Sequence, residues 1–423
     1  MASITDMLFF YNLFLYAFSA GIHLASLWNP KARQWVNGRR SLLKRIKVAV
    51  AATGGPLIWM HCASLGEFEQ GRPLLEDLKK RYPGHRILLT FFSPSGYEIK
   101  KNNSGADLVF YLPLDGKRNV QYFLDAVNPE LVIFVKYESW HYYLTELKKR
   151  NIPTLLVSAI FKPEQTFFGI FGGFLRGLLE NYSHIFVQDQ DSFEILKKYG
   201  LRAEISIAGD TRFDRVTEII NQPFTHHHIE SFCAGNQVLI AGSTWEEDEK
   251  MLADLSKQQP TLKMIIAPHE VSESAIQKTK ERFDDSVLLS ALESDLKKNN
   301  STVLIIDCIG MLSKIYRYST ICYVGGGFNI AGIHNVLEPA AYGRVVIFGP
   351  NHQRSAEPEA LIASGAGFSY QRRGTLIEIV ERLLTDKRLL QEKNETARSF
   401  VEKRKGATKK ITDYIEKNLR LSR

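Results

Sequence analysis

The chain has 423 residues, 44% of them hydrophobic and 24% charged, a composition typical of a globular protein with two domains of roughly 200 residues. Its four cysteines, Cys62, Cys233, Cys308 and Cys322, are far apart and form no CxxC pair, which indicates neither a disulfide framework nor a zinc site. The formal net charge of +8 is compatible with a nucleic acid, a membrane surface or an anionic substrate. The distribution of the charges has to decide between these partners.

The N-terminal residues 1–30 are predicted to form a membrane anchor. Residues 7–28 contain no Asp, Glu, Lys or Arg, whereas residues 31–47 contain seven basic residues and no acid. About 20 helical residues span the hydrocarbon core of a bilayer, and flanking Lys and Arg stay on the cytoplasmic side. We therefore expect 31–56 to be a basic juxtamembrane segment and the rest of the chain to face the cytoplasm. The alternative is a helix that lies in one leaflet, which its polar side chains would tolerate better.

After this segment, short apolar runs alternate with helical stretches, a pattern that predicts parallel sheets covered on both faces. The alternation lapses at 221–236, where a proline, three histidines and a glycine indicate a linker, and then resumes. We therefore expect an α/β protein with two Rossmann-like domains facing across a cleft. The predicted parts are an N-terminal domain at 57–220, the linker, a C-terminal domain at 237–405 and a charged helical tail at 406–423.

The loops that follow the strands are the candidate sites, because ligands of open parallel sheets bind beyond the carboxyl ends of the strands. None of these loops contains a G-x-G-x-x-G sequence or a P-loop, which argues against NAD and against Walker-type use of ATP. The first loop, CASLGE, ends at Glu67, where an apolar strand meets a helix. An acid at this position either stabilises the positive end of the helix dipole or acts as a general base in a cleft.

The glycine-rich stretch 325–343 is the most informative part of the second half. Three glycines end a strand, and a helix is predicted to begin near His334 or Asn335, so free backbone N–H groups could face an anion there. Glu338 would lie one turn into this helix and could accept hydrogen bonds from ribose hydroxyls. The alternative is a glycine-rich turn with a helix-capping acid. The loop Pro268–Glu270 after a nearby strand favours a shared binding site.

Several charged residues of the first half have two interpretations. Arg212 and Lys136 follow strands and could meet a carboxylate or a phosphate, or could be ordinary surface charges. Glu138 could be a site residue or an acid at a helix start. The run His226–His228 is interpreted as a solvated linker rather than a metal site, because adjacent residues rarely converge on one ion.

Six motifs in order resemble those of the Kdo (3-deoxy-D-manno-octulosonic acid) transferases of lipopolysaccharide synthesis. They are SLGE at 64–67, SPSGYE at 93–98, GDTRFD at 209–214, GSTW at 242–245, APHE at 267–270, and GGGF followed by HNVLEPAAYG within 325–343. The resemblance covers nearly the whole chain, including the predicted anchor. Motifs of this number and order are specific to a family.

The resemblance implies a two-domain GT-B fold at the inner (cytoplasmic) membrane and an inverting transfer of Kdo from CMP-Kdo to a lipid A precursor. It implies neither a metal nor a cofactor, and no nucleic acid partner. Glu67 would be the general base, and Glu138 and Arg212 would assist the transition state. The implied substrate and nucleotide contacts are Ser64, Gly66, Pro268, His269, Ile309, Gly310, Met311, Gly326, Asn335, Val336, Leu337 and Glu338.

The chain departs from the family pattern at three places. Lys136 stands where the family often has an acid, His141-Tyr142 replaces Pro-Asn after Trp140, and Arg212 stands where the family often has Lys. These departures concern the acceptor side. Two other functions remain compatible with the sequence: a GT-B enzyme that uses a UDP-sugar, either a glycosyltransferase or an epimerase, and a non-catalytic membrane adaptor.

Overall fold

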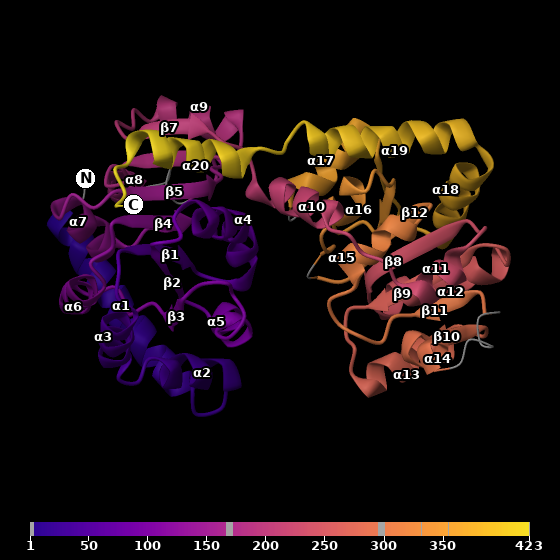
Figure 1. Cartoon of the computed structure of the whole chain (residues 1–423), viewed down its shortest axis with the longest axis horizontal. Helices are drawn as coiled ribbons and strands as arrows, with labels where there is room; N and C mark the ends of the chain where they lie inside the picture. The colour runs from indigo at the N-terminus through magenta and orange to yellow at the C-terminus, as the bar shows by residue number, and fades with distance from the viewer. Residues whose placement is uncertain (1–3, 166–171, 295–300, 331, 354, 423) are drawn as a thin grey trace. The chain divides into compact units, whose positions relative to one another are not determined.

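A computed structural model describes residues 4–165, 172–294, 301–330, 332–353 and 355–422. The chain forms two compact units, the first made of residues 1–215 and 406–423 and the second of residues 216–405. Each unit contains one seven-stranded sheet, and every paired strand in both sheets is parallel (Figure 1). The prediction of two parallel-sheet α/β domains is confirmed.

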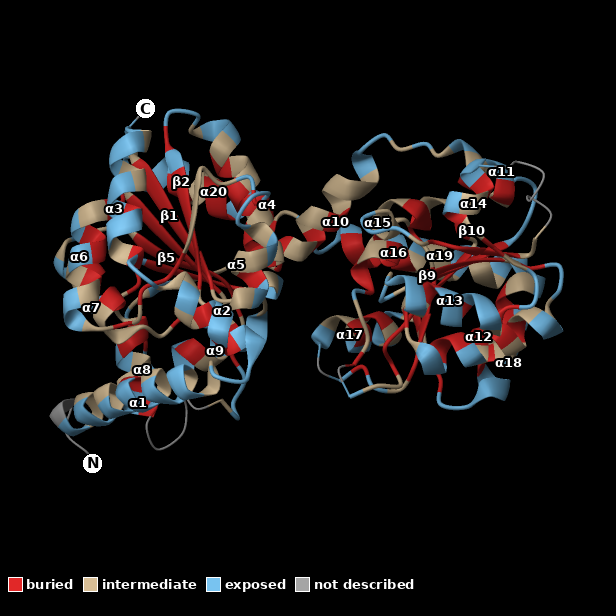
Figure 2. Cartoon of the chain, turned by 90° about the horizontal axis from the view of Figure 1, so that it is seen from below, coloured by how far each residue is buried: buried red, intermediate tan, exposed pale blue. Residues whose placement is uncertain are grey.

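The sheet of the first unit has the strand order β3-β2-β1-β4-β5-β6-β7. Its five inner strands are almost entirely buried, as the red strands in Figure 2 show, because helices cover both faces, whereas the edge strands β3 and β7 are only partly buried. Alternate residues of β1 serve the two faces: Trp59 packs in one hydrophobic cluster, and Ile58 and Met60 pack in the other. The strands are β1 Leu57–Cys62, β2 Arg86–Phe91, β3 Leu108–Tyr111, β4 Leu131–Val135, β5 Thr154–Ala159, β6 His184–Val187 and β7 Glu204–Ile207.

The helices of the first unit connect these strands, and the last one comes from the end of the chain. Ile411 and Ile415 of this last helix, α20, are fully buried in the same cluster as Met60. The C-terminal tail is therefore part of the first unit. The helices are α1 Ile4–Ala25, α2 Pro30–Gly38, α3 Leu42–Thr53, α4 Leu65–Arg81, α5 Pro94–Lys100, α6 Lys117–Val127, α7 His141–Lys149, α8 Gly172–Leu179, α9 Gln190–Lys198 and α20 Ala407–Asn418, and α10 Thr211–Asn221 crosses into the second unit.

The sheet of the second unit has the order β10-β11-β9-β8-β12-β13-β14. Its strands are β8 Val238–Thr244, β9 Lys263–Pro268, β10 Ser286–Leu288, β11 Val303–Ile305, β12 Ile321–Val324, β13 Val346–Phe348 and β14 Gly367–Ser369. Its helices are α11 His227–Cys233, α12 Glu246–Gln258, α13 Glu273–Arg282, α14 Leu289–Ser294, α15 Leu312–Ile315, the 3-10 helix η3 Tyr316–Tyr318, α16 Leu337–Ala341, α17 Ala356–Ser364, α18 Arg373–Thr385 and α19 Lys387–Glu402.

The second unit differs from the sequence-based expectation in two respects. The stretch 221–236, expected to be a linker, contains α11, whose Ile229 and Phe232 are buried in the core of the second unit. The proline and histidines hide this short amphipathic helix in the sequence. The strands β10 and β14 were not predicted, because each has three residues and lies at an edge of the sheet, where little apolar sequence is needed.

Helix α1 has one face against the first unit and one face exposed. Within the described residues, its segment Asp6–Ala25 is the one helical stretch long and apolar enough to cross a membrane, a test that signal sequences also pass. Leu15 is buried and Phe18 is half-buried, whereas Phe10 and Phe14 are mostly exposed. Figure 2 shows exposed residues along much of its length. An exposed apolar face of this kind is typical of a contact site for a membrane or another protein.

Candidate functional site

In the sheet of the first unit, the strand order reverses between β1 and β4, which makes this position the topological switch point. Starting from β1, the chain builds β2 and β3 on one side of the sheet and then returns to place β4 on the other side of β1. The loops that leave the carboxyl ends of β1 and β4 therefore diverge, and this is the point where open α/β sheets bind ligands. The loop after β1 leads to Glu67, and the loop after β4 contains Glu138.

Glu67 lies in the first turn of α4 and forms a capping box with Ser64. The Ser64 N–H donates to Glu67 Oε2 over 3.2 Å, and the Glu67 N–H donates to Ser64 Oγ over 3.4 Å. These bonds are those of a helix-capping acid. Burial nevertheless raises the pKa of Glu67 above its usual value, against the opposing effect of the backbone N–H groups and of Lys136. A raised pKa makes a carboxylate a stronger base near neutral pH.

Glu138 is 3% exposed and lies in a buried polar cluster at the same end of the sheet. The indole N–H of Trp140 donates to its carboxylate, and the ring nitrogen Nε2 of His61 is 3.5 Å from Glu138 Oε2. The other ring nitrogen of His61 is hydrogen-bonded to Thr90 on the neighbouring strand β2 over 2.9 Å. The cluster therefore links β1, β2 and the loop after β4.

Burial disfavours the charged forms of the groups in this cluster. Burial, and next the charge of Glu67, raise the pKa of Glu138 well above its usual value. Burial lowers the pKa of His61 to about 3, so the imidazole carries no charge at neutral pH. Two carboxyl groups that interact in this way do not both ionise readily. Glu67 is the more exposed of the two and is the one that ionises first.

Arg212 is the second residue of α10, which follows the edge strand β7, and is paired with Asp210. Its Nε donates to Asp210 Oδ2 over 2.8 Å, and its Nη2 donates to the same oxygen. Thr211 between them bonds to Ser158 Oγ over 3.1 Å and donates to the carbonyl oxygen of Gln70, one turn beyond Glu67 in α4. The loop that holds Arg212 is thus attached to the helix that begins with the candidate base.

The second unit has its own change of winding, between β8 and β12. The aromatic rings of Trp245, His269 and His334 are stacked there. The ring of His269, after β9, is 4.5 Å from the ring of Trp245 and 4.5 Å from the ring of His334, and Trp245 Nε1 donates to His334 Nε2 over 3.1 Å. Burial, and next the charge of His269, lower the pKa of His334 to about 4. The three rings form a flat stack, and its central ring, His269, is exposed.

Asp248 of α12 ties the ends of β8 and β12 together. Its carboxylate accepts hydrogen bonds from the N–H groups of Trp245 and Gly326 over 2.9 and 2.8 Å. A Cβ atom on Gly325 would lie 2.4 Å from the carbonyl oxygen of Ser243, and Gly326 has a φ of +92°. These glycines therefore serve the close approach of two strand ends and a left-handed turn.

The predicted nucleotide contacts at 335–338 lie close together, but the helix begins later than the start that was expected near His334 or Asn335. Helix α16 begins at Leu337, with Val336 before it, and has five residues. The Leu337 N–H donates to Asn335 Oδ1 over 3.1 Å, and the Asn335 amide donates to Glu338 Oε1 over 3.2 Å. The N–H of Leu337, which was expected to be free for an anion, is thus already bonded to the Asn335 side chain in an Asx turn.

The remaining predicted residues of the second unit also lie at the carboxyl ends of its strands. Pro268 ends β9, and Ile309, Gly310 and Met311 follow β11, the strand paired with β9. Ile309 is 84% exposed, so this apolar side chain is available for a ligand. In the first unit, Gly66 is exposed between Ser64 and Glu67.

The structure adds residues that the sequence interpretation missed. His61 is a single histidine in the apolar strand LIWMHC, paired in register with Thr90, and this exception to the apolar pattern was the available signal. Trp245 and His334 stood in quoted motifs without a role. Among the described residues, no group of three or more His, Cys, Asp or Glu side chains could hold a metal ion.

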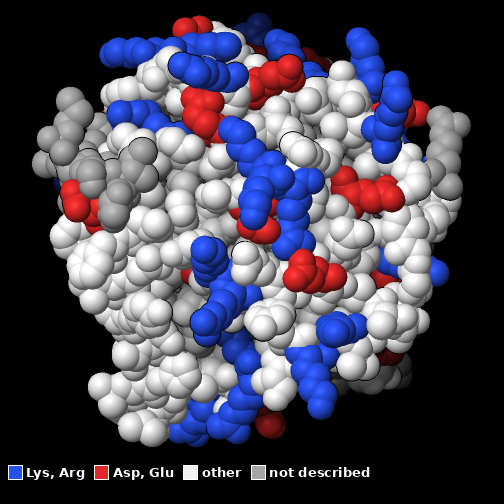
Figure 3. Space-filling view, turned by 90° about the vertical axis from the view of Figure 1, so that its left-hand side faces the viewer, with Lys and Arg blue, Asp and Glu red and all other residues white. Residues whose placement is uncertain are grey.

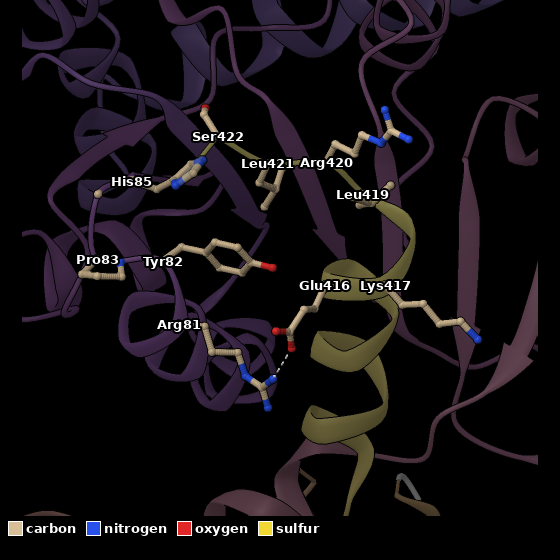
Figure 4. A pocket seen from close by; sticks show the side chains of 11 residues that line it. Arg81, Tyr82, Pro83, His85, Glu416, Lys417, Leu419, Arg420, Leu421 and Ser422 are labelled. Carbon is tan, nitrogen blue, oxygen red and sulfur yellow. Dashed lines mark hydrogen bonds and ion pairs between the residues drawn. The ribbon is translucent and has the colours of Figure 1, made fainter.

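A pocket of about 740 Å³ lies at the other end of the first sheet, before the start of β2 (Figure 4). In it Arg81 Nη1 is 3.1 Å from Glu416 Oε2 of α20. Because ligands of open α/β sheets bind at the carboxyl ends of the strands, this pocket is separate from the candidate site. Its lining residues are Arg81, Tyr82, Pro83, Gly84, His85, Glu416, Lys417, Leu419, Arg420, Leu421 and Ser422.

The family model and several of the curated relatives that match this chain are Kdo transferases. Residues 38–215 match the family model of 3-deoxy-D-manno-octulosonic-acid transferase (kdotransferase). The chain is 29% identical over 341 residues to the 3-deoxy-D-manno-octulosonic acid transferase of Aquifex aeolicus, covering 78% of this chain and 87% of that protein. It is 28% identical over 383 residues to the enzyme of the same name from Haemophilus influenzae, covering 86% of this chain and 88% of that protein.

Solved structures with similar folds support the GT-B architecture. The UDP-GlcNAc 2-epimerase of Neisseria meningitidis, solved with UDP-GlcNAc, is 15% identical with a TM-score of 0.59, covering 86% of this chain and 100% of that chain. MurG of Acinetobacter baumannii is 16% identical with a TM-score of 0.56, covering 86% and 99%. At these identities the likeness concerns the fold.

Proposed function

We propose, since this chain belongs to the Kdo transferase family, that it transfers Kdo from CMP-Kdo to a hydroxyl group of a lipid A precursor in lipopolysaccharide synthesis. The observation that carries the proposal is the half-buried acid Glu67 at the point where the first sheet changes its winding, in a chain with this family's motifs. An inverting transfer needs one base to take the proton of the acceptor hydroxyl, and Glu67 fits this role.

In the first unit, Glu138 and Arg212 would support the transfer. Neutral Glu138 would keep the local charge low enough for Glu67 to ionise alone, because a second carboxylate nearby would raise the pKa of Glu67 further. The Arg212 guanidinium, held in place by Asp210, would stabilise the charge that develops on the phosphate of the leaving CMP. Ser64 and exposed Gly66 would allow the acceptor to approach the base.

In the second unit, the residues around the ring stack would bind the nucleotide. His269 and Pro268 would contact CMP, with exposed Ile309 and the glycine at 310 on the next loop. Glu338 would accept a hydrogen bond from a ribose hydroxyl. A flat aromatic surface suits a nucleobase, because stacking contributes about 1–3 kcal/mol per base in single-stranded nucleic acid binding.

The N-terminal part would hold the enzyme on the cytoplasmic face of the inner membrane. The exposed face of α1 carries large apolar side chains, among them Phe10, Phe14 and Leu24. Exposed Lys and Arg side chains follow in 31–47, and Figure 3 shows Lys and Arg gathered in a band beside an area without charges. Such a face suits a bilayer with anionic lipids.

The contacts of α1 favour a helix that lies in one leaflet over one that spans the bilayer. Tyr11 and Asn12, near its middle, are hydrogen-bonded to Asp115 and Tyr142 of the α/β body. A helix crossing the hydrocarbon core would have to leave these partners. The apolar segment 167–179, a second candidate membrane surface for which a buried helix is the favoured alternative, lies partly outside the described residues. Within them, Leu178 and Leu179 of α8 are buried in the core of the first unit.

The donor can be tested by thermal unfolding of the purified full-length chain with added nucleotides. CMP is expected to raise the unfolding temperature, because a ligand that binds only the folded state stabilises it. UDP is the control. The specific observation that favours the second candidate, an enzyme using a UDP-sugar, is the similar fold of the epimerase that binds UDP-GlcNAc. Protection by UDP but not by CMP would select that candidate.

A further inference from the structure

The buried face of α1 is joined to the loop that precedes α7. Tyr11 donates its hydroxyl hydrogen to the Asp115 carboxylate, and the backbone N–H of His141 donates to the Tyr11 hydroxyl oxygen over 3.3 Å. The hydroxyl of Tyr142 donates to Asn12 Oδ1 over 2.9 Å. Since α7 begins at His141, α1 holds the start of this helix through polar contacts.

Asp115 extends the connection, because it also serves the start of α7. Its carboxylate accepts the backbone N–H groups of Tyr142 and Tyr143, each over 3.0 Å. These N–H groups would otherwise be without partners in the first turn of the helix. One buried carboxylate thus binds both α1, through Tyr11, and the first turn of α7.

A second connection runs through aromatic rings. The ring of Phe18 in α1 is 5.8 Å from the ring of Phe92, after β2, which is 5.1 Å from the ring of Trp140. Trp140 donates its indole N–H to Glu138. Arg39 also contacts Phe92, because its Nη2 donates to the Phe92 carbonyl oxygen over 2.9 Å. Three contacts therefore lead from α1 to the acid beside Glu67.

We propose that α1 is part of the transfer site as well as the membrane contact, and that Tyr11 and Phe18 are positioning residues for Glu138. The proposal rests on the proposed function for its kinetic part. The loop 136–140 contains no helix or strand, so its conformation depends on the side chains that surround it. Loss of Phe18 would remove a ring that packs against Phe92, and Phe92 in turn contacts Trp140. Glu138 would then lose the fixed position of its hydrogen-bond donor.

The kinetic test compares the half-buried Phe18 with the mostly exposed Phe10 of the same helix α1 in the full-length chain. With a water-soluble, deacylated acceptor analogue, Phe18→Ala is expected to lower kcat about 10-fold to 100-fold, because small displacements of reacting groups have effects of this size. The KM for CMP-Kdo should stay unchanged. Phe10→Ala, on the exposed face, should keep kcat and weaken binding to phosphatidylethanolamine–phosphatidylglycerol vesicles.

Two variants guard against a trivial loss of folding. Phe18→Leu keeps most of the apolar volume and should recover most of kcat, whereas Tyr11→Phe removes only the hydroxyl and should lower kcat without loss of vesicle binding. Equal kcat values for Phe18→Ala and the wild type, or a loss in Phe10→Ala as large as in Phe18→Ala, would overturn the proposal.

Hydrogen exchange tests the connection without any enzyme assay. In Phe18→Ala and Tyr11→Phe, the amides of the segment 136–143 should exchange faster than in the wild type, because the N–H groups bonded to Asp115 and Tyr11 become less protected. Phe10→Ala should leave them unchanged. Unchanged exchange in all three variants would contradict the proposal. If the wild type transfers no Kdo, the proposed function fails, while this measurement still decides on the connection.

Discussion

The two units have similar sheets but different chemistry where each sheet changes its winding. In the first unit this place holds the acids Glu67 and Glu138 with neutral His61. In the second unit it holds a glycine turn and the rings of Trp245 and His269. The comparison teaches that parallel topology fixes the position of a site, whereas the residues of a few loops decide between proton transfer and binding of a flat ligand.

Both units share one further feature near the carboxyl ends of their strands. Lys136 after β4, Ser158 in β5 and Ser243 in β8 all have positive φ values although they are not glycine, at +77°, +53° and +53°. Such conformations are unfavourable for residues with side chains and are concentrated at functional sites. In each unit the backbone is thus strained near the strand ends that lead into these loops.

The largest effect should come from the candidate base. Glu67→Gln keeps the size of the side chain but cannot take a proton, so kcat should fall about 10²-fold to 10⁴-fold. The affinity for CMP, a property of the second unit in this account, should stay unchanged in calorimetry. Glu69→Gln in the same helix is the control and should keep its activity. A Glu67→Gln enzyme as fast as wild type would remove Glu67 from the mechanism.

The next effect concerns the leaving group. Arg212→Ala should lower kcat about 10²-fold to 10³-fold, as loss of a preorganised group near developing charge does, and should weaken CMP binding much less. Arg212→Lys keeps the charge but not the forked contact with Asp210, so it should recover part of the rate. Arg215→Ala in the same helix serves as the control. A loss confined to the KM for CMP-Kdo would assign Arg212 to ground-state binding instead.

A smaller effect is expected in the second unit. His269→Ala removes the central ring of the stack and should raise the Kd for CMP about 5-fold to 150-fold, which corresponds to about 1–3 kcal/mol. The value of kcat at saturating donor should change less. Exposed His227 in α11 provides the matched His→Ala control. Unchanged CMP affinity in calorimetry would mean that the stack has a structural role only.

The smallest effect is a shift in the pH profile. The ratio kcat/KM should rise with pH as Glu67 ionises, at a higher pH than for an ordinary glutamate, because burial raises its pKa. Lys136 opposes this rise, so Lys136→Met should raise the pKa of Glu67 and move the acid limb to higher pH. Exposed Lys149→Met should leave the limb in place. A shift to lower pH would show that another group governs the limb.

Much of the fold was predictable, because buried parallel strands are nearly continuous apolar runs. The apolar runs at β1, β4 and β8 and the turns after them are enough to place Glu67, Glu138 and the GSTW motif at strand ends. The start of α16 was not predictable in this way, since the side chain of Asn335 competes for the N–H of Leu337.

The double role of α1 was also hidden in the sequence. An uncharged run of this length predicts an anchor but does not reveal which face contacts protein. The bond between Tyr11 and Asp115 joins residues 104 positions apart, and the contact of Phe18 with Phe92 is similarly distant in sequence. Only tertiary structure brings these residues together.

The most direct test of the account is the mass of the acceptor after incubation with the full-length chain, CMP-Kdo and a tetraacylated lipid A precursor, in the presence of EDTA. The acceptor is expected to gain the mass of one or more Kdo residues, and EDTA is expected to leave the yield unchanged. An acceptor of unchanged mass would contradict Kdo transfer. A gain that EDTA abolishes and Mg²⁺ restores would contradict the metal-independent mechanism built on Glu67 and Arg212.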